Sequence, residues 1–218
     1  MSEKTKSFYS FLALLLLISF ILACRSSSTT PTKTQPNNPT STNNYSTKVK
    51  IKTPADKDVV EIKIGGDDTK IEYSGKVVRG DLKDSDKRKY SLEGGSQIAE
   101  VKMKDADGFK VRTNDGKLLW KIKISNDKIK ISDNEENQNA FELVKRDDGA
   151  KVEQNENKFG EVKFYKDRQK VKVKDANDKE LFDSNTDRYS VAYGVLLLDK
   201  IPEDLRYIII AELLARNL

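Results

Sequence analysis

Hydrophobic and charged residues alternate along most of the chain between residues 48 and 183. In residues 48–52, for example, Val49 and Ile51 alternate with three lysines. Because successive side chains of a β-strand point to opposite faces, this period of two predicts strands with one buried face and one face in water. The clearest strand segments are 48–52, 60–64, 101–104, 109–112, 121–124, 128–131, 162–164 and 171–174. Shorter ones are 70–73, 76–79, 89–92, 141–144, 150–153 and 180–183. We expect about a dozen strands in total.

Glycine, aspartate and asparagine separate these segments. Residues 107–108, 114–116 and 148–149 are Asp-Gly, Asn-Asp-Gly and Asp-Gly, which supply the positive φ angles that tight hairpins need. The chain is therefore predicted to be an antiparallel meander. Residues 109–120 also align with 171–182, since both read as a strand, an acidic turn, a lysine and a strand ending in leucine and an aromatic residue. This similarity reflects either a duplication or a shared type of hairpin.

The pattern changes at Pro202. Pro202, Glu203 and Asp204 are typical of a helix start, where proline fits the first turn and acids meet the positive end of the helix dipole. Residues 205–216 are apolar around most of the circumference, which predicts a helix buried on most sides. At roughly 21 Å this helix is too short to span a bilayer but matches the height of a small barrel. We therefore predict a mainly β fold in which the strands form a barrel around a hydrophobic C-terminal helix. The alternative is a β-sandwich with a packed C-terminal helix.

This arrangement resembles the tubby C-terminal fold, which LURP-one-related proteins and phospholipid scramblases share. In that family a twelve-stranded barrel wraps a hydrophobic C-terminal helix. The resemblance covers residues 48–218 and rests on the strand number, on hairpins such as 109–120 and on the helix at 205–214. The chain has no recognisable phosphoinositide-binding residue set and not the cytoplasmic setting of those relatives, so membrane-lipid binding is an analogy here.

Residues 1–23 read as a secretory signal peptide. Lys4 and Lys6 form a short basic region, and residues 8–23 are almost entirely apolar. This apolar segment is shorter than the roughly 20 residues that a spanning helix needs, and no cluster of charges follows it.

The signal segment ends in Ile21, Leu22, Ala23 and Cys24, which resembles the bacterial lipobox. The resemblance implies that the Cys24 thiol takes a diacylglycerol, that the chain is cleaved after Ala23, and that acyl chains such as palmitate hold Cys24 in a membrane. Two or three such chains anchor a protein stably, at about 0.8 kcal/mol per buried CH₂ group. Cys24 is the only cysteine and has no disulfide partner. The alternative is an ordinary cleaved signal with an incidental cysteine.

Residues 24–45 are predicted to be a lipidated cysteine and a disordered tether. Residues 25–44 are serine, threonine, proline, asparagine and glutamine apart from Arg25 and Lys33, so they offer nothing for a core. Residues 46–218 form one β domain with the C-terminal helix. The expected location is extracytoplasmic, on a periplasmic or outer face, and the sequence does not indicate which membrane.

The charge balance argues against nucleic-acid binding. The formal net charge is +5, of which Lys4, Lys6 and Glu3 contribute +1 and Arg25 and Lys33 contribute +2. The remaining +2 on the domain is small, and no basic block contains interleaved aromatic residues.

The chain has no histidine, and its single thiol is the predicted lipidation site. Cys/His zinc sites and Ser–His or Cys–His catalysis are therefore excluded in their usual forms. We predict no enzyme, no catalytic residue and no cofactor.

The acidic turns are weak candidates for metal ligands. Asp105, Asp107, Asp175 and Asp178 lie in segments that look like pieces of a calcium loop. Neither segment has the closing glutamate that a full loop needs, so we expect solvated turns and no metal site.

Lysines and aromatic residues follow the strands. Twelve lysines are predicted to line outward faces, either for attraction to an anionic membrane or polysaccharide or for solubility and protection of strand edges: Lys48, Lys50, Lys52, Lys102, Lys104, Lys121, Lys123, Lys128, Lys130, Lys170, Lys172 and Lys174. Five aromatic residues are expected to pack in the core around the helix, with a ligand mouth as the alternative: Phe109, Trp120, Phe141, Phe164 and Phe182.

Together these features predict a non-enzymatic, membrane-tethered lipoprotein with a structural or binding role in the cell envelope. Two alternatives remain: a lipid- or glycolipid-binding carrier that uses a cavity of the barrel, and an enzyme based on carboxylates or tyrosine. The membrane is the expected partner through Cys24, and no ligand-binding residue or protein partner is indicated.

Overall fold

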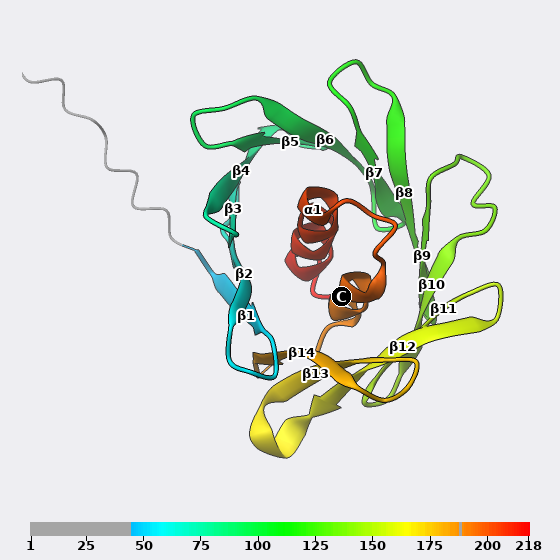
Figure 1. Ribbon diagram of the computed structural model, residues 1–218. Coiled ribbons are helices and arrows are strands. Elements are labelled where there is room, and N and C mark those ends of the chain that lie inside the picture. The colour runs from blue at the N-terminus through cyan, green and yellow to red at the C-terminus, as the bar shows by residue number, and fades with distance from the viewer. Residues whose placement is uncertain (1–44, 188) are drawn as a thin grey trace, which may run out of the picture. The chain divides into compact units, whose positions relative to one another are not determined.

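The computed structural model describes residues 45–187 and 189–218. The predicted signal peptide, the lipobox residues Ile21, Leu22, Ala23 and Cys24, and nearly all of the tether lie outside the described residues. Within them, fourteen strands form a closed antiparallel barrel that surrounds a short C-terminal helix (Figure 1). The strands are β1 (Thr47–Lys52), β2 (Asp58–Ile64), β3 (Asp68–Tyr73), β4 (Lys76–Asp84), β5 (Lys87–Leu92), β6 (Gln97–Lys104), β7 (Gly108–Arg112), β8 (Leu118–Ile124), β9 (Lys128–Ser132), β10 (Phe141–Arg146), β11 (Gly149–Gln154), β12 (Asn157–Tyr165), β13 (Lys170–Asp175) and β14 (Glu180–Asn185).

The topology is a simple meander. Each strand pairs with the next along the chain, and β14 closes the barrel against β1 through Lys52 and Asp183. The sandwich alternative is therefore wrong, and the expected count of about twelve strands was too low. Every segment singled out by its alternation overlaps one strand of the barrel. Short polar segments such as β14 are full members of the wall, because a barrel closes only when each strand has two neighbours.

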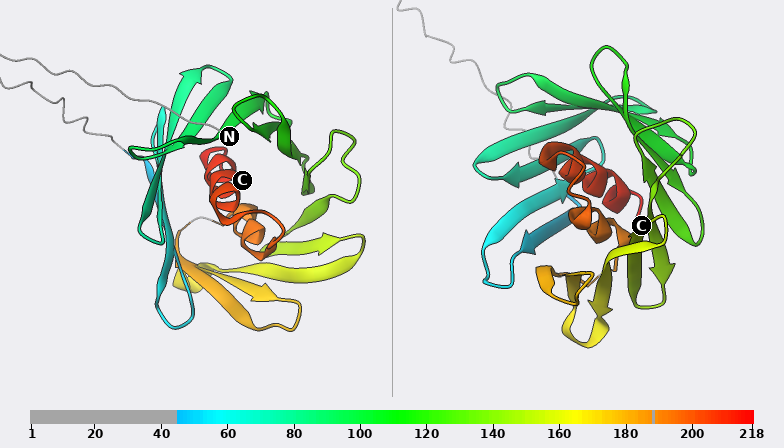
Figure 2. Two further views of the ribbon diagram at one scale, coloured as in Figure 1. Left: turned by 45° about the horizontal axis from the view of Figure 1, so that its top comes forward. Right: turned by 45° about the vertical axis from the view of Figure 1, so that its right-hand side comes forward.

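The alternation separates a dry interior from a charged outer surface. In β1, Val49 and Ile51 are 4% and 0% exposed, and Lys48 and Lys50, which alternate with them, face water. The interior holds α1 (Glu203–Ala215) and the 3₁₀ helix η2 (Val191–Leu197), as three views of the ribbon show (Figures 1 and 2). Consecutive residues 208–210 of α1 are all fully buried, so the predicted helix with an apolar circumference is confirmed.

The helix η2 had no counterpart among the expected elements. All seven of its residues are buried, and Ser190 caps it by accepting a hydrogen bond from the Ala192 amide at 3.1 Å. A side chain at Gly194 would lie 2.9 Å from Val152 and 3.1 Å from Leu143, so this turn packs its backbone directly against β10 and β11. All residues of this short 3₁₀ helix are buried, so its sequence is uniformly apolar and shows no periodic pattern from which a helix could be predicted.

Three hairpins share one five-residue turn: Thr53–Lys57, Thr113–Lys117 and Asp175–Lys179. In each, the first amide donates to the fifth carbonyl at 2.9 Å, and the fourth residue has a positive φ of 61°, 84° or 62°. The side-chain oxygen of the first residue also accepts from the amide of the final lysine, at 3.3, 3.0 and 3.0 Å. Residues 109–120 and 171–182 therefore share a hairpin type, which the hairpin at 53–57 also has.

Candidate functional site

A buried polar cluster fixes the C-terminal end of α1 to the wall. Glu212 of α1 is fully buried and accepts hydrogen bonds from Tyr90 Oη at 2.8 Å and from Arg88 Nη1 at 3.2 Å. Arg88 also donates to the Gly66 carbonyl at 3.2 Å. Burial, and then the Glu212 carboxylate, raise the pKa of Tyr90 well above its usual value, so Tyr90 stays a hydrogen-bond donor.

The sequence marks this cluster by charged and polar residues at positions where the pattern predicts apolar ones. Arg88 and Tyr90 occupy inward positions of β5, where the pattern calls for apolar residues, and Glu212 interrupts the apolar helix. Buried charges are stable only when they are paired. An arginine on the inward face of a strand and a glutamate in an apolar helix therefore predict a buried ion pair between the two. Gly80 on β4 completes the arrangement, because a side chain there would lie 2.4 Å from the Tyr90 ring.

A second polar contact holds the N-terminal end of α1. Tyr73 Oη of β3 donates to Asp204 at 2.5 Å, and Tyr207 Oη donates to Glu203 at 3.0 Å. The two tyrosine rings meet edge to face with centroids 4.9 Å apart. Burial raises the pKa of both tyrosines, and the neighbouring acids raise it further. The helix is thus attached to the wall at both ends.

The last residues of the chain close the helix with a capping motif. Asn217 has a φ of 57° and donates from its amide to the Leu214 carbonyl at 3.0 Å, and the Leu218 amide donates to the Leu213 carbonyl at 3.3 Å. The Ser190 hydroxyl donates to the Leu218 carbonyl. These bonds place Leu214 and Leu218 beside the segment that leads into η2.

The barrel wall is closed by few strand contacts beside this motif. β1 and β14 share a single residue pair, whereas β1 and β2 share six. After β14 the chain turns inward towards η2, and the Thr186 amide donates to the Gln169 carbonyl at 2.7 Å rather than to β1. The first half of β1 therefore lacks a strand on that side.

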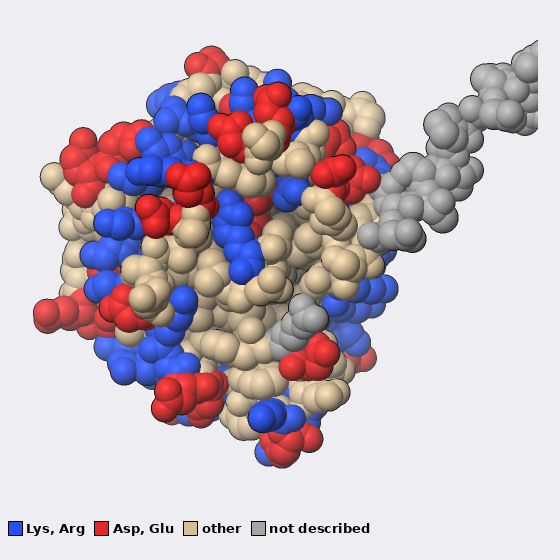
Figure 3. Space-filling view, turned by 180° about the vertical axis from the view of Figure 1, so that it is seen from behind, with Lys and Arg blue, Asp and Glu red and all other residues tan. Residues whose placement is uncertain are grey.

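A cavity of about 300 Å³ occupies this seam between β1 and the chain that follows β14. Its apolar lining comes from Val49, Leu214 and Leu218, and its polar lining includes Ser46 and Tyr193. We name it the seam cavity. Seen from the end of the barrel opposite to that in Figure 1, charged residues ring the rim and uncharged residues predominate at the centre (Figure 3).

Tyr193 is the most unusual residue of the seam cavity. It is 1% exposed, and its hydroxyl lies beside the hydroxyls of Ser184 and Thr186. Burial raises its pKa, and hydrogen bonding with these two hydroxyls offsets part of that effect. The cavity therefore has a group of hydroxyls on one side and leucines on another. The seam cavity can thus hold an amphiphile, with its apolar part on the leucines and a polar group at Tyr193.

The acidic residues considered as metal ligands are not brought together. Asp105 and Asp107 lie in the turn between β6 and β7, and Asp175 and Asp178 in the turn between β13 and β14. Asp175 Oδ1 accepts from the backbone amides of residues 177 and 179 at 2.9 and 3.0 Å, so it shapes its own turn. Among residues 45–187 and 189–218, no three acidic, cysteine or histidine side chains converge as a metal site would require.

The aromatic residues and lysines largely follow the sequence pattern. Phe109, Trp120 and Phe141 are buried in the core, while Phe164 and Phe182 are half-buried against it. None of the twelve lysines is buried. Many lysines pair with glutamates on the outer wall. Glu72, for example, accepts ion pairs from Lys63 at 2.8 Å and Lys70 at 2.6 Å, which lower its pKa to about 2.

Comparison of the chain with protein-family models, with curated proteins and with solved structures finds no match. The resemblance to the tubby C-terminal fold and to the lipobox therefore stays a prediction. Within the described part of the chain, no helix has both the length and the apolar character needed to cross a bilayer.

Proposed function

We propose that this chain is an envelope lipoprotein that is anchored through lipid on Cys24 and binds a small amphiphile, without catalysis, in the seam cavity. The observation that carries the binding role is the cavity itself, with leucine walls and the buried Tyr193 hydroxyl. The anchor rests on the lipobox sequence and the polar tether. The proposed setting is the extracytoplasmic face of a membrane.

The size of the seam cavity supports a small ligand. Its volume of about 300 Å³ is at the lower end of the range for small-molecule sites. A water-sized group takes about 30 Å³, so the cavity holds roughly ten heavy atoms. A single short acyl chain with a carboxyl or hydroxyl end has this size and this chemistry.

The location of the seam cavity also supports the proposal. Ser46 and Val49, at the start of β1, line the cavity, and the tether precedes them directly in the sequence. An amphiphile that leaves a membrane would therefore meet the cavity at the end of the domain to which the anchor is attached.

A probe titration tests the binding role. Decanoate is titrated into the full chain in detergent-free nanodiscs, and binding is followed by the fluorescence of Trp120. We expect Leu214→Trp, which fills the seam cavity, to weaken binding at least tenfold. Leu119→Trp is the matched control, because Leu119 is a half-buried leucine outside the cavity, and it should bind within twofold of the unchanged chain. Each variant is monitored through its own difference spectrum, since both add a tryptophan. Equal binding by all three chains would overturn the proposal.

Lipid extraction tests the anchor. Cys24→Ser is expected to move the protein from the membrane fraction to the soluble fraction, and Ser27→Ala should leave it in the membrane fraction. Native mass spectrometry of the same preparations shows whether the mature chain carries acyl groups. A Cys24→Ser chain that still partitions with membranes would contradict the anchor and leave the cavity proposal to its own test.

A further inference from the structure

The outer wall has a second hollow, far from the seam in strand order, on β6, β7 and β8. Two neighbouring rows of outward residues cross these strands. The first row is Lys102, Lys110 and Lys121, and the second is Lys104, Gly108 and Lys123. Strands lie about 4.8 Å apart, so Lys104 and Lys123 face each other across roughly 10 Å with no side chain between them.

Gly108 is required by the backbone. Its φ is 138°, and a side chain there would lie 1.9 Å from the Ile122 carbonyl oxygen. The position therefore stays empty above the sheet, and a hollow of about 230 Å³ remains over it. We name this the Gly108 hollow. Four lysines line it, together with Asp107 and Asn137: Lys104, Lys110, Lys121 and Lys123.

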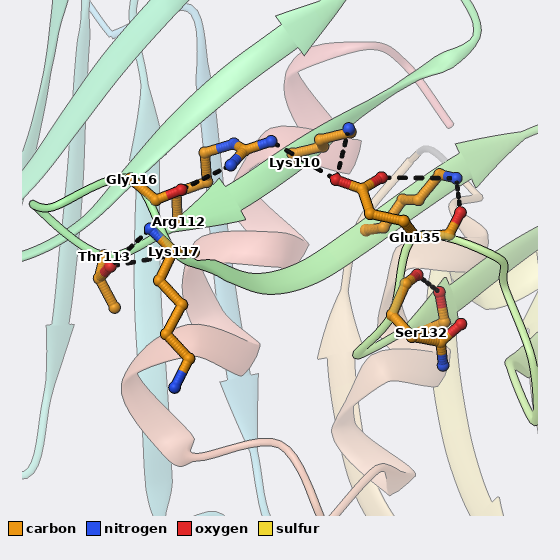
Figure 4. Close-up of polar contacts among 9 residues, drawn as sticks. Lys110, Arg112, Thr113, Gly116, Lys117, Ser132 and Glu135 are labelled. Carbon is orange, nitrogen blue, oxygen red and sulfur yellow. Dashed lines mark hydrogen bonds and ion pairs between the residues drawn. The ribbon is translucent and has the colours of Figure 1, made fainter.

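The charges of the Gly108 hollow are only partly neutralised. Glu135, in the loop after β9, reaches over the wall and accepts ion pairs from Lys110 at 2.8 Å, Arg112 at 3.6 Å and Lys121 at 3.8 Å (Figure 4). Lys104 and Lys123 form no ion pair with a described residue. The four lysines and Asp107 that line the hollow carry a net charge of +3, and the single Glu135 carboxylate is shared among Lys110, Lys121 and Arg112, so the hollow keeps a net charge of at least +2.

The same wall contains a close counterpart in which more of the charges are paired. A hollow of about 250 Å³ lies over Gly149, and its charged lining residues are Arg146, Asp148, Lys151, Lys158, Glu161 and Lys163, with a net charge of +2. Glu161 pairs with Lys158 at 3.2 Å and with Lys163 at 2.9 Å, and Lys151 pairs with Glu153 at 2.5 Å. A shallow hollow with lysines is therefore a feature of this wall. The one over Gly108 is distinguished by two lysines that face each other without an ion pair to a described residue, whereas all three lysines over Gly149 are paired.

We propose that the Gly108 hollow binds a phosphate monoester or inorganic phosphate. Lysine ammonium groups act as compact point charges with three donors each, which suits the oxygens of a small dianion. A phosphate group carries a charge of about −1.5 to −2 at pH 7 and so matches the net +2 of the hollow. Asn137 also lines the hollow, and its side-chain oxygen accepts a hydrogen bond from the Ser132 hydroxyl at 3.2 Å. This site is independent of the seam cavity and of the proposed function.

The test uses the full chain in detergent micelles and the backbone amide signals of Gly108 and Gly149 in NMR spectra. Inorganic phosphate replaces chloride at constant ionic strength, and a second titration uses dihexanoyl phosphatidic acid. We expect a saturable shift at Gly108 and none at Gly149. Similar affinity for both probes identifies free phosphate as a ligand, whereas binding of the lipid alone identifies a lipid headgroup. Either result supports a phosphate site.

Two double variants give the matched comparison. Lys104→Gln with Lys123→Gln should weaken binding about tenfold, which corresponds to about 1.4 kcal/mol. Lys158→Gln with Lys163→Gln removes the same charge from the hollow over Gly149 and should change affinity less than twofold. Lys104→Arg with Lys123→Arg, which keeps the charge, should bind within about threefold and shows that the glutamine pair is not simply misfolded. The proposal is overturned if neither probe saturates, or if the two glutamine pairs weaken binding equally.

Discussion

Replacing Glu212 with leucine tests how the barrel holds its central helix. The Glu212 carboxylate is fully buried, and the Arg88 side chain is 5% exposed. Without Glu212, the Arg88 guanidinium keeps one acceptor, the Gly66 carbonyl at 3.2 Å, and the Tyr90 hydroxyl loses its acceptor. Removing one partner of a buried ion pair costs about 3–5 kcal/mol. We therefore expect Glu212→Leu to lower the free energy of unfolding by about 4 kcal/mol, a large share of the roughly 5–15 kcal/mol that holds a typical domain folded.

Equilibrium unfolding in urea measures this effect. Trp120 is the single tryptophan and is 9% exposed, so its fluorescence reports loss of the core. With a denaturant dependence of about 2 kcal/mol per molar urea, the midpoint should fall by about 2 M. Glu135→Leu is the control, because Glu135 is 46% exposed in its ion pairs on the outer wall. A surface pair of this kind contributes about 1 kcal/mol or less.

A double variant separates the charge from the packing. In Arg88→Met with Glu212→Leu no buried charge remains, and the unpartnered Tyr90 hydroxyl accounts for a cost of about 2 kcal/mol. The double variant should therefore be more stable than Glu212→Leu alone. The reasoning about this cluster is refuted if the losses of unfolding free energy measured for Arg88→Met alone and for Glu212→Leu alone simply add in the double variant. It is also refuted if Glu212→Leu lowers the free energy of unfolding by less than about 1 kcal/mol.

Three further predictions concern the wall around the helix. Gly80→Ala should lower the free energy of unfolding by about 1–3 kcal/mol in urea titrations, because the new methyl group meets the Tyr90 ring at 2.4 Å, and a neutral result would contradict that contact. Tyr73→Phe removes the hydrogen bond to Asp204 and should cost about 1.5 kcal/mol, and an unchanged urea midpoint would show that this bond contributes nothing. Two lysines lower the pKa of Glu72 from about 4.5 to about 2, so its carboxylate stabilises the fold above pH 4.5 and this contribution is lost as the pH falls towards 2. The thermal unfolding temperature of Glu72→Gln should accordingly change less with pH across that range than the unfolding temperature of the unchanged chain. An equal change of unfolding temperature with pH in both chains would contradict this prediction.

The wall of the barrel could be predicted from the sequence because its rules are local. Alternation of apolar and charged residues depends only on neighbours two positions apart, and hairpin turns depend on about five residues. Each expected strand segment is therefore present, and the position of α1 inside the wall follows from its apolar circumference. The stated total of about a dozen was too low although each of the fourteen strands has a segment in the sequence pattern, and the alternation is weak in short strands such as β14, where five of six residues are half-buried or exposed.

The interior contacts and both hollows could not be predicted in this way. Arg88 and Glu212 are 124 residues apart, so only the fold brings them together, although each was visible as a charge at an apolar position. The helix η2 has no period at all. The Gly108 hollow depends on which lysines share a row across three strands, and this follows from strand register rather than from any single segment.

The position of the seam cavity follows from the topology. In a closed meander the first and last strands are always neighbours, as β1 and β14 are here. A chain that continues from the last strand into the interior must leave the wall at that seam, and β14 accordingly shares one residue pair with β1. Whatever precedes β1 in the sequence joins the domain beside the same seam. The chain that enters β1 and the chain that leaves β14 for the interior therefore meet at the seam because of the order of the strands alone, and the proposed link between anchoring and ligand binding rests on this order.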